Sequence, residues 1–275
     1  MNEMKIRKIV RDAIEEDIGT GDITTDNTID EDEMGKGVIK VKEKSVIAGL
    51  EVAKTVFNKI DKDLEFNYKK EDGEKVEEGN IIAEVSGKVR SILKGERLAL
   101  NFLQRMSGIA TKTNNYVNQV KDYDVKIVDT RKTTPNLRIL EKWSVHLGGG
   151  KNHRMGLYDA VLIKDNHIKV AGGIGKAINK VKTNIPHTVK IEVEVEDLEG
   201  VKKALENDAD IIMLDNMNLE DMRKAVDLIG DDSIVEASGG INLENIEDVA
   251  ETDVDVISVG ALTHQIESID ISLDI

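Results

Sequence analysis

The chain has 275 residues and a formal net charge of -15, with 53 Asp and Glu against 38 Lys and Arg. An acidic balance argues against general nucleic-acid binding, which requires a basic surface. The absence of cysteine excludes disulfides and thiolate metal sites. No apolar run approaches about 18 residues and the N-terminal stretch is charged throughout, so we expect a cytoplasmic protein that contacts neither membrane nor nucleic acid.

The first hundred residues mix helices and strands in no regular order. Apolar residues at helical spacing predict helices over residues 3–17 and 50–60. Residues 19–25 (GTGDITT) are expected to form a turn whose polar side chains cap the local backbone. The predicted strands cover residues 37–47, 64–68 and 80–85. This order is typical of a small α+β domain, which we place at residues 1–108.

A long helix is predicted over residues 95–120, as a bridge between two domains. Arg97, Asn101 and Arg105 recur at i, i+4 and i+8 and therefore share one face of it. Gly108 is expected to kink the helix.

Beyond Tyr123 short apolar strands alternate strictly with helices, which indicates a parallel sheet. A GxGxxG motif after the first of these strands would favour a dinucleotide-binding fold, and it is absent. We therefore predict a (β/α) barrel short of eight complete units, at residues 109–264. The predicted strands are 125–129, 160–164, 189–195, 211–215, 234–237 and 256–259, and the helices are 137–147, 175–181, 198–207, 219–229 and 243–250.

Residues 129–165 form a basic island in this acidic chain, with seven Lys and Arg against four acids. Such a cluster suggests a site for a small, highly charged anion, although a solvated basic face would have the same composition. The basic residues are Arg131, Lys132, Arg138, Lys142, Lys151, Arg154 and Lys164.

Polar residues follow five of the predicted strands, at the ends where barrel enzymes place their active sites. In the third strand Glu192, Glu194 and Glu196 alternate with apolar residues and are expected to face the barrel lumen. Buried carboxylates need partners, for which Lys132 and Lys164 are candidates. Mg²⁺ held between Glu194 and Asp215 is another possibility, and a solvated edge strand is the alternative to both.

The last two predicted strand ends are rich in glycine, and each is expected to open a helix. Backbone N–H groups at a helix start bind phosphate, and glycine permits close approach of the backbone. Residues 238–242 and 260–261 are therefore candidate phosphate loops. Taken together, the residues predict a ligand with several anionic groups, such as a sugar phosphate that carries a diphosphate.

Nine segments resemble the family of nicotinate-nucleotide pyrophosphorylase (carboxylating), also called quinolinate phosphoribosyltransferase. They span nearly the whole chain in the order of the family. The segments are 16–25 (EDIGTGDITT), 96–111 (ERLALNFLQRMSGIAT), 129–138 (DTRKTTPNLR), 148–157 (GGGKNHRMGL), 162–168 (LIKDNHI), 191–195 (IEVEV), 212–217 (IMLDNM), 236–241 (EASGGI) and 258–264 (SVGALTH).

The resemblance implies a type II phosphoribosyltransferase fold, in which an N-terminal α/β sandwich precedes an incomplete, seven-stranded α/β barrel and the tail, residues 265–275, returns to the first domain. It implies transfer of phosphoribose from 5-phosphoribosyl 1-diphosphate (PRPP) to quinolinate with decarboxylation. The products are nicotinate mononucleotide, diphosphate and CO₂, the step belongs to de novo NAD synthesis, and Mg²⁺ is required. It also implies homodimers, or hexamers made of dimers, in which Arg97 is shared with the neighbouring site.

The resemblance also assigns roles to individual residues. Lys132, Lys164, Glu194 and Asp215 are expected to be catalytic, and Glu194 and Asp215 are expected to hold Mg²⁺ directly or through water. His153 is expected either to contact a substrate carboxylate or to orient the loop of Arg154. The expected substrate-binding residues are Arg97, Thr130, Arg131, Lys132, His153, Arg154, Lys164, Glu194, Asp215, Ser238, Gly239, Gly240, Val259, Gly260 and Ala261.

Two other functions are compatible with parts of this pattern. A related phosphoribosyltransferase acting on nicotinate would need fewer cations around its acceptor. A non-catalytic metabolite-binding barrel would not need the full set of acids and bases.

Overall fold

The computed structural model describes residues 3–275, which divide into two compact units. Unit 2 comprises Asn115–Lys132 and Gly150–Ala261, and the remaining residues form unit 1. Residues 133–149, which the sequence placed within the barrel, belong to unit 1. Within residues 3–275 no helix is both long and apolar enough to cross a membrane.

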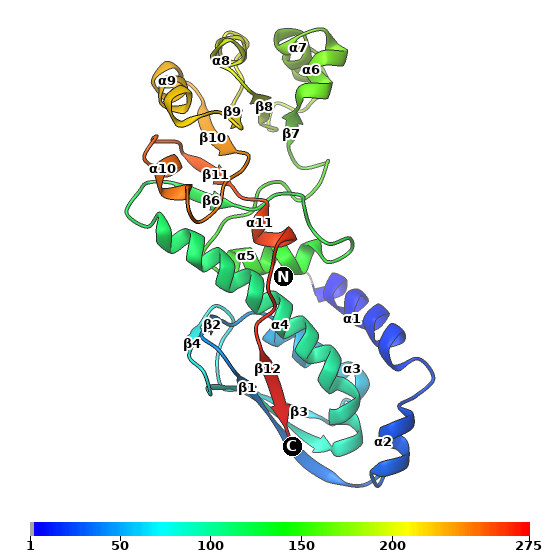
Figure 1. Ribbon diagram of the computed structural model, residues 1–275. Coiled ribbons are helices and arrows are strands. Elements are labelled where there is room, and N and C mark those ends of the chain that lie inside the picture. Colours follow the sequence, from blue (N-terminus) through cyan, green and yellow to red (C-terminus); the bar gives the residue numbers. More distant parts are fainter. Residues whose placement is uncertain (1–2) are drawn as a thin grey trace. The chain divides into compact units, whose positions relative to one another are not determined.

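Unit 1 contains an antiparallel sheet of four strands in the order β12-β1-β5-β3 (Figure 1). The strand predicted over residues 37–47 is two strands, because the chain turns after Val41 and the second strand pairs with β4 instead. The last strand of the chain, β12, pairs with β1. The strands are β1 Met34–Val41, β2 Ser45–Val46, β3 Glu65–Tyr68, β4 Lys75–Val76, β5 Ile81–Lys88 and β12 Ile271–Asp274.

The helices of unit 1 match the predicted spacing at α1 and α3. The segment expected to be a turn is a short helix, α2, whose first turn is capped by the Asp22 carboxylate at 2.9 Å from the Thr25 backbone nitrogen. The capping role assigned to this segment is confirmed, whereas the predicted turn is a helix from Ile23 onward. The helices are α1 Glu3–Ile18, α2 Ile23–Thr28, α3 Leu50–Ile60, α4 Val89–Gln119 and α5 Arg138–Leu147.

Helix α4 starts six residues before its predicted beginning and continues into unit 2 without a break at Gly108. Gly108 serves close packing, since a Cβ atom there would lie 2.1 Å from the Glu267 carbonyl oxygen. The helix is unbroken at this glycine, which lets the C-terminal tail pass against it.

Unit 2 contains a parallel sheet of six strands in the order β6-β11-β10-β9-β8-β7. A single parallel bridge joins Lys151 to Val128 of β6, and the seventh strand implied by the resemblance is not formed among residues 3–275. The open order, with β6 and β7 at its ends, agrees with an incomplete barrel. The strands are β6 Lys126–Val128, β7 Val161–Ile163, β8 Ile191–Val195, β9 Ile211–Asp215, β10 Ile234–Ser238 and β11 Val256–Ser258.

The helices of unit 2 follow the strands in the alternation that the sequence predicted, and Figure 1 shows α7, α8 and α9 in a row beside the sheet. Helix α6 was not predicted, and α10 begins at Ile246 rather than at Leu243. The helices are α6 Asp165–Ala171, α7 Ile174–Asn184, α8 Leu198–Leu205, α9 Leu219–Ile229, α10 Ile246–Ala250 and, at its boundary with unit 1, α11 Ala261–His264.

Candidate functional site

Polar residues of three neighbouring strands lie on one face of the sheet in unit 2, which we call the site face. Met213 of β9 pairs with Glu194 of β8 and with Glu236 of β10, and paired residues point to the same side of a sheet. Side chains alternate along a strand, so Asp215 and Ser238 lie on this face as well. Both are the last residues of their strands, at the carboxyl edge of the sheet.

Lys164 joins the site face from the end of β7. Leu162 pairs with Glu192, so a residue two positions further along lies on the same side. The Lys164 Nζ lies 2.5 Å from a carboxylate oxygen of Glu194. The backbone N–H of Lys164 donates to the His167 Nδ1 at 3.0 Å, which fixes the start of α6. Lys164 is thus the cationic partner that the sequence required for Glu194, whereas Glu196 is exposed beyond the strand end.

Two arginines approach each other at this edge of the sheet. Arg131 and Lys132 follow β6 and are exposed, and the Lys132 backbone N–H donates to the Thr130 hydroxyl at 3.1 Å. Arg154 is half-buried in the loop before β7, and its guanidinium donates to the Ala160 carbonyl at 3.3 Å. Burial lowers the pKa of Arg154, and the positive charge of Arg131 lowers it further. The two guanidiniums therefore share one electrostatic environment.

The loop that carries Arg154 is anchored by a buried acid that the sequence pattern showed only as part of the basic island. Asp129 is fully buried at the end of β6. Its two carboxylate oxygens accept from the Asn152 side-chain amide at 2.7 Å and from the His153 backbone N–H at 2.9 Å. Both bonds tie the loop to the end of the strand.

Beneath this loop, His153 meets two carboxylates of the site face. Its Nε2 lies 3.1 Å from Glu192 and 3.6 Å from Glu236, and both glutamates are buried. One oxygen of Glu236 has no hydrogen-bond partner among the described residues. Burial raises the pKa of Glu236 to about 7, and the charge of Glu192 adds to the rise while His153 and Ser258 oppose it. Sequence spacing alone gave no sign of this cluster, because its members come from a loop, β8 and β10.

The loop after β10 depends on glycine. Gly239 has φ +93°, and a Cβ atom there would lie 2.3 Å from the Asn216 side-chain oxygen. Asn216 follows Asp215 with φ +55°, and its amide donates to the Asp215 carboxylate at 2.8 Å. Its backbone N–H donates to the Ser238 carbonyl at 2.9 Å. Asn216 therefore links the ends of β9 and β10.

Of the two helices expected to follow the glycine-rich strand ends, one is found where it was predicted. Helix α11 begins at Ala261, directly after Gly260, but it has only four residues. Helix α10 begins six residues after Gly240, so the expectation that residues 238–242 open a helix is wrong. The candidate phosphate loops are thus stretches of glycine-rich backbone, Gly239–Gly240 and Gly260–Ala261, the second of which follows the buried Val259.

The basic island is also divided. Arg138 and Lys142 lie on α5 in unit 1, where Lys142 is buried and the Arg138 guanidinium donates to the Thr133 hydroxyl at 2.9 Å. The cations that remain in unit 2 are Arg131, Lys132, Lys151, Arg154 and Lys164.

Arg97 and Arg105 share a face of α4 but differ in their surroundings. Arg105 donates to the buried Glu141 carboxylate at 2.5 Å and to the Thr134 hydroxyl at 2.6 Å, so its role is structural. Arg97 is exposed, and its side chain makes no hydrogen bond or ion pair with any other residue of the range 3–275. Its side chain is therefore available to a ligand or to another chain.

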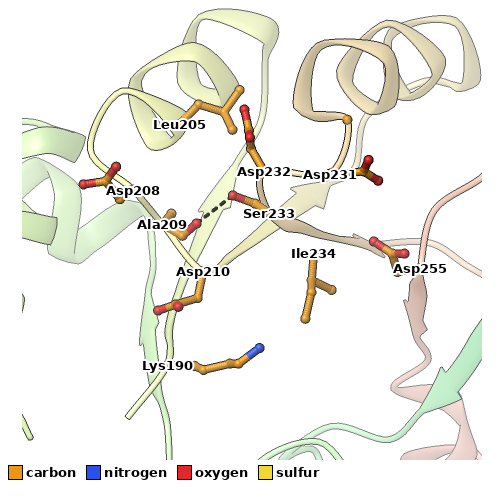
Figure 2. A pocket seen from close by; sticks show the side chains of 11 residues that line it. Lys190, Leu205, Asp208, Ala209, Asp210, Asp231, Asp232, Ser233, Ile234 and Asp255 are labelled. Carbon is orange, nitrogen blue, oxygen red and sulfur yellow. Dashed lines mark hydrogen bonds between the residues drawn. The ribbon is translucent and has the colours of Figure 1, made fainter. Parts of the chain in front are cut away.

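A cavity of about 640 Å³ lies at the opposite, amino-terminal edge of the sheet in unit 2 (Figure 2). Its lining includes five aspartates and a single lysine, Lys190, so this cavity is unfavourable for an anionic ligand. Two of the aspartates hold strand ends, since Asp210 accepts from the Ile191 N–H at 2.7 Å and Asp255 from the Val235 N–H at 2.8 Å. This edge serves stability rather than chemistry.

The chain matches known proteins over its whole length. Residues 22–107 match the family described as Quinolinate phosphoribosyl transferase, N-terminal domain, and residues 109–274 match the corresponding C-terminal domain. A probable nicotinate-nucleotide pyrophosphorylase [carboxylating] of Methanocaldococcus jannaschii is 46% identical, over 98% of this chain and 96% of the relative. The probable nicotinate-nucleotide pyrophosphorylase [carboxylating] of Bacillus subtilis is 42% identical, over 100% of this chain and 95% of the relative.

A solved structure agrees with the sequence matches. The nicotinate-nucleotide pyrophosphorylase from Francisella tularensis superposes with a TM-score of 0.96 at 42% identity, covering 100% of this chain and 97% of that one. The agreement extends over both units and includes the strands that carry the site face. With both family domains matched in order and relatives above 40% identity along the full length, this chain belongs to the quinolinate phosphoribosyltransferase family.

Proposed function

We propose that the site face and its flanking loops transfer phosphoribose from PRPP to quinolinate with loss of CO₂, giving nicotinate mononucleotide and diphosphate for NAD synthesis. One observation carries the choice of acceptor, namely that Arg131 follows β6, Arg154 lies in the loop before β7 and Lys164 follows β7, so that cations gather at one edge of the sheet. Two neighbouring guanidiniums repel each other and favour a ligand with more than one negative charge. Quinolinate has two adjacent ring carboxylates, each able to accept a bidentate pair from an arginine.

The proposed roles follow from position along the carboxyl edge of the sheet. Arg131, Arg154 and Lys164 would bind the carboxylates of quinolinate. Lys132, next to Thr130, would neutralise the diphosphate of PRPP, and Glu194 and Asp215 would hold the ribose hydroxyls. The two glycine-rich loops would bind the 5-phosphate through backbone N–H groups, except that of Val259, which donates to the Val128 carbonyl at 2.9 Å. The residues of these loops are Ser238, Gly239, Gly240, Val259, Gly260 and Ala261.

Catalysis by this arrangement is mainly orientation and electrostatics. The pyridine nitrogen of quinolinate attacks C1 of the ribose as the bond to diphosphate breaks. Glu194 and Asp215 lie on the same face and can stabilise the positive charge that develops at C1. The resulting pyridinium withdraws electrons from the ring, so the carboxylate at position 2 leaves as CO₂ and a proton takes its place. No residue needs to form a covalent bond to the substrate.

The acids of the site face also fit the Mg²⁺ that the family requires. Glu194 and Asp215 offer the carboxylate oxygens that this ion prefers, and each has one oxygen engaged by a neighbour, Lys164 or Asn216. They would hold the ion directly or through its bound water. When bound, Mg²⁺ supplies positive charge to the diphosphate leaving group.

The direct test is a product assay on the wild-type chain, using PRPP, Mg²⁺ and quinolinate labelled in the 2-carboxylate. We expect labelled CO₂ and nicotinate mononucleotide in equal amounts, with no CO₂ when PRPP is omitted. Nicotinate in place of quinolinate is expected to give a much lower kcat/KM, because one of the two arginines would lack a partner. Absence of PRPP-dependent CO₂ release, or a preference for nicotinate, would refute the proposal.

Arg97 would complete the site from a second copy of the chain, as in the homodimer, or trimer of dimers, that the family resemblance implies. Its exposure on α4 without a partner in its own chain supports this part of the proposal. The cytoplasmic location predicted from the sequence belongs to the same proposal.

Mixing two inactive variants tests the shared arginine. Neither Arg97→Ala nor Lys132→Ala is expected to be active alone, because each damages every site of a homodimer. In a mixed dimer one site receives both damaged residues and the other receives none. A symmetric dimer has two equivalent sites, and one of them is intact in the mixed dimer. We therefore expect up to about half of the wild-type activity per mixed dimer. If activity does not return although subunit exchange is verified by mass spectrometry, Arg97 acts within its own chain or not at all.

A further inference from the structure

The two ring nitrogens of His153 are both engaged by the protein. The Arg154 backbone nitrogen lies 2.8 Å from Nδ1, and an amide N–H can only donate, so Nδ1 is the acceptor and carries no proton. In the neutral ring the proton is then on Nε2, which faces Glu192 at 3.1 Å. A histidine held in this way has no N–H left for a substrate carboxylate.

The contacts of His153 connect a buried strand with a substrate-binding residue. Glu192 lies within β8, and its side chain is 3% exposed. On the other side of the His153 ring, Nδ1 accepts a hydrogen bond from the Arg154 backbone N–H. Asp129 fixes the two residues immediately before Arg154. Through these contacts Glu192 is linked to the backbone of Arg154.

We propose that Glu192 is a positioning residue for the substrate-binding Arg154 and that it acts through His153. The inference rests on the proposed function, since it takes Arg154 to bind a carboxylate of quinolinate. It resolves the two roles that the sequence left open for His153 in favour of orienting the loop. Glu236 completes the cluster from β10, at 3.6 Å from Nε2.

A metal ion held by His153, Glu192 and Glu236 is the main alternative, because their ligand atoms lie within 4.8 Å of one another. A metal-bound histidine almost always donates its other ring N–H to an acceptor. Here the other nitrogen faces the N–H of Arg154, which is a donor. Metal on Nε2 would leave the ring without the proton that normally orients such a ligand, so the geometry favours a hydrogen-bonded relay.

The kinetic test compares Glu192→Ala, Glu192→Gln and His153→Asn. We expect Glu192→Ala to raise KM for quinolinate by about 10- to 100-fold, the cost of a lost hydrogen bond to a charged group. KM for PRPP should change less than about 3-fold, because the loops that bind it are held separately. Glu192→Gln should restore most of the affinity, since its amide oxygen can still accept from Nε2. Glu206→Ala, an exposed glutamate on unit 2, is the matched control.

The double variant Glu192→Ala/His153→Asn separates a relay from a direct contact. If Glu192 acts only through His153, the double variant should raise KM for quinolinate no more than about 2-fold beyond the larger single effect. Additive effects, or equal increases in both KM values, would overturn the proposal. So would a wild-type KM in Glu192→Ala.

A measurement without substrate tests the same contacts if Glu192→Ala fails to fold. Imidazole ¹⁵N NMR of the wild-type chain, with the signal assigned by its loss in His153→Asn, should show a neutral ring protonated on Nε2. Protonation on Nδ1, or a stoichiometric metal ion lost in Glu192→Gln, would refute the relay. The NMR result does not depend on activity. If the chain releases no CO₂ from quinolinate, the proposed function is refuted. The protonation of the His153 ring still decides whether the hydrogen-bonded relay exists.

Discussion

Replacing Lys164 with methionine is expected to lower kcat/KM for quinolinate by about 100- to 1,000-fold, the usual effect of removing one group that stabilises developing charge. The lysine lies at the end of β7, and its Nζ is 2.5 Å from Glu194. The substitution removes a cation from the proposed carboxylate site. It also leaves Glu194 without its partner, so the charge balance around the ribose changes at the same time.

The effect on stability should be small by comparison. The Lys164 side chain is 45% exposed, and ion pairs of this kind contribute at most about 1 kcal/mol to the free energy of unfolding. Methionine has nearly the same length and keeps the contacts of the aliphatic stem. Urea unfolding should therefore give a midpoint close to that of the wild type, while the steady-state assay shows the loss.

Lys169→Met is the matched control, because Lys169 is exposed on α6 only five residues further along the chain. It should retain wild-type kinetics. Adding Glu194→Gln to Lys164→Met removes the unpaired charge and should leave activity low, since both groups are proposed to contact the substrates. A Lys164→Met chain that keeps more than about a tenth of the wild-type kcat/KM would remove Lys164 from the catalytic residues.

The location of this edge was predictable because parallel strands share a direction. Polar residues at the ends of successive strands, such as Lys164 and Asp215, must come to one edge of the sheet wherever the strands lie in the chain. The alternation of Glu192 and Glu194 also predicted their common face correctly. These patterns do not predict which side chains of different strands contact one another.

That missing pairing explains why the buried cluster was not found from the sequence. Glu192 and Glu236 come from β8 and β10, which are separated by β9, and their partner His153 comes from a loop. No spacing along the chain encodes the relative height of two strands that are not neighbours. The sequence predicted that Glu192 needed a cationic partner or a metal, and it offered Lys132 and Lys164, which follow strand ends.

The errors in the elements have similar causes. Helix α6 has seven residues, which is too short for apolar periodicity to be distinguished from a loop. Helix α5 has a clear helical pattern, and the sequence placed it in the barrel because it lies between two strands. It belongs to unit 1, since the partner against which a helix packs is a tertiary property. Because the sequence does not show tertiary packing, Lys142, a buried residue of α5, was counted within the basic island.

Gly239→Ala is expected to lower the affinity for PRPP by about 10- to 100-fold while leaving binding of quinolinate within about 2-fold. Two independent costs fall on this residue. Its φ of +93° is strained for any residue with a Cβ atom, by about 1–3 kcal/mol. The new methyl group would also lie 2.3 Å from the Asn216 side-chain oxygen and 2.8 Å from the Asn216 backbone nitrogen.

The collision with Asn216 extends the effect of the substitution to Asp215, the acid proposed to bind the ribose. Asn216 cannot stay in place beside the new methyl group, and its amide holds the Asp215 carboxylate at 2.8 Å. A shift of Asn216 therefore disturbs the phosphate loop and the acid proposed to bind the ribose together. Isothermal titration with PRPP and with quinolinate separately measures the two affinities.

Two further variants separate the collision from the backbone strain. Asn216→Gly combined with Gly239→Ala removes the side-chain oxygen but not the strained φ, so it should recover only part of the affinity for PRPP. Gly172→Asn is the control for a left-handed position with room, because its φ is +85° and the nearest atom to a Cβ is 3.6 Å away on Lys176. That variant should bind PRPP as the wild type does. Equal losses in Gly172→Asn and Gly239→Ala would mean that general destabilisation, and not the loop after β10, controls the affinity for PRPP.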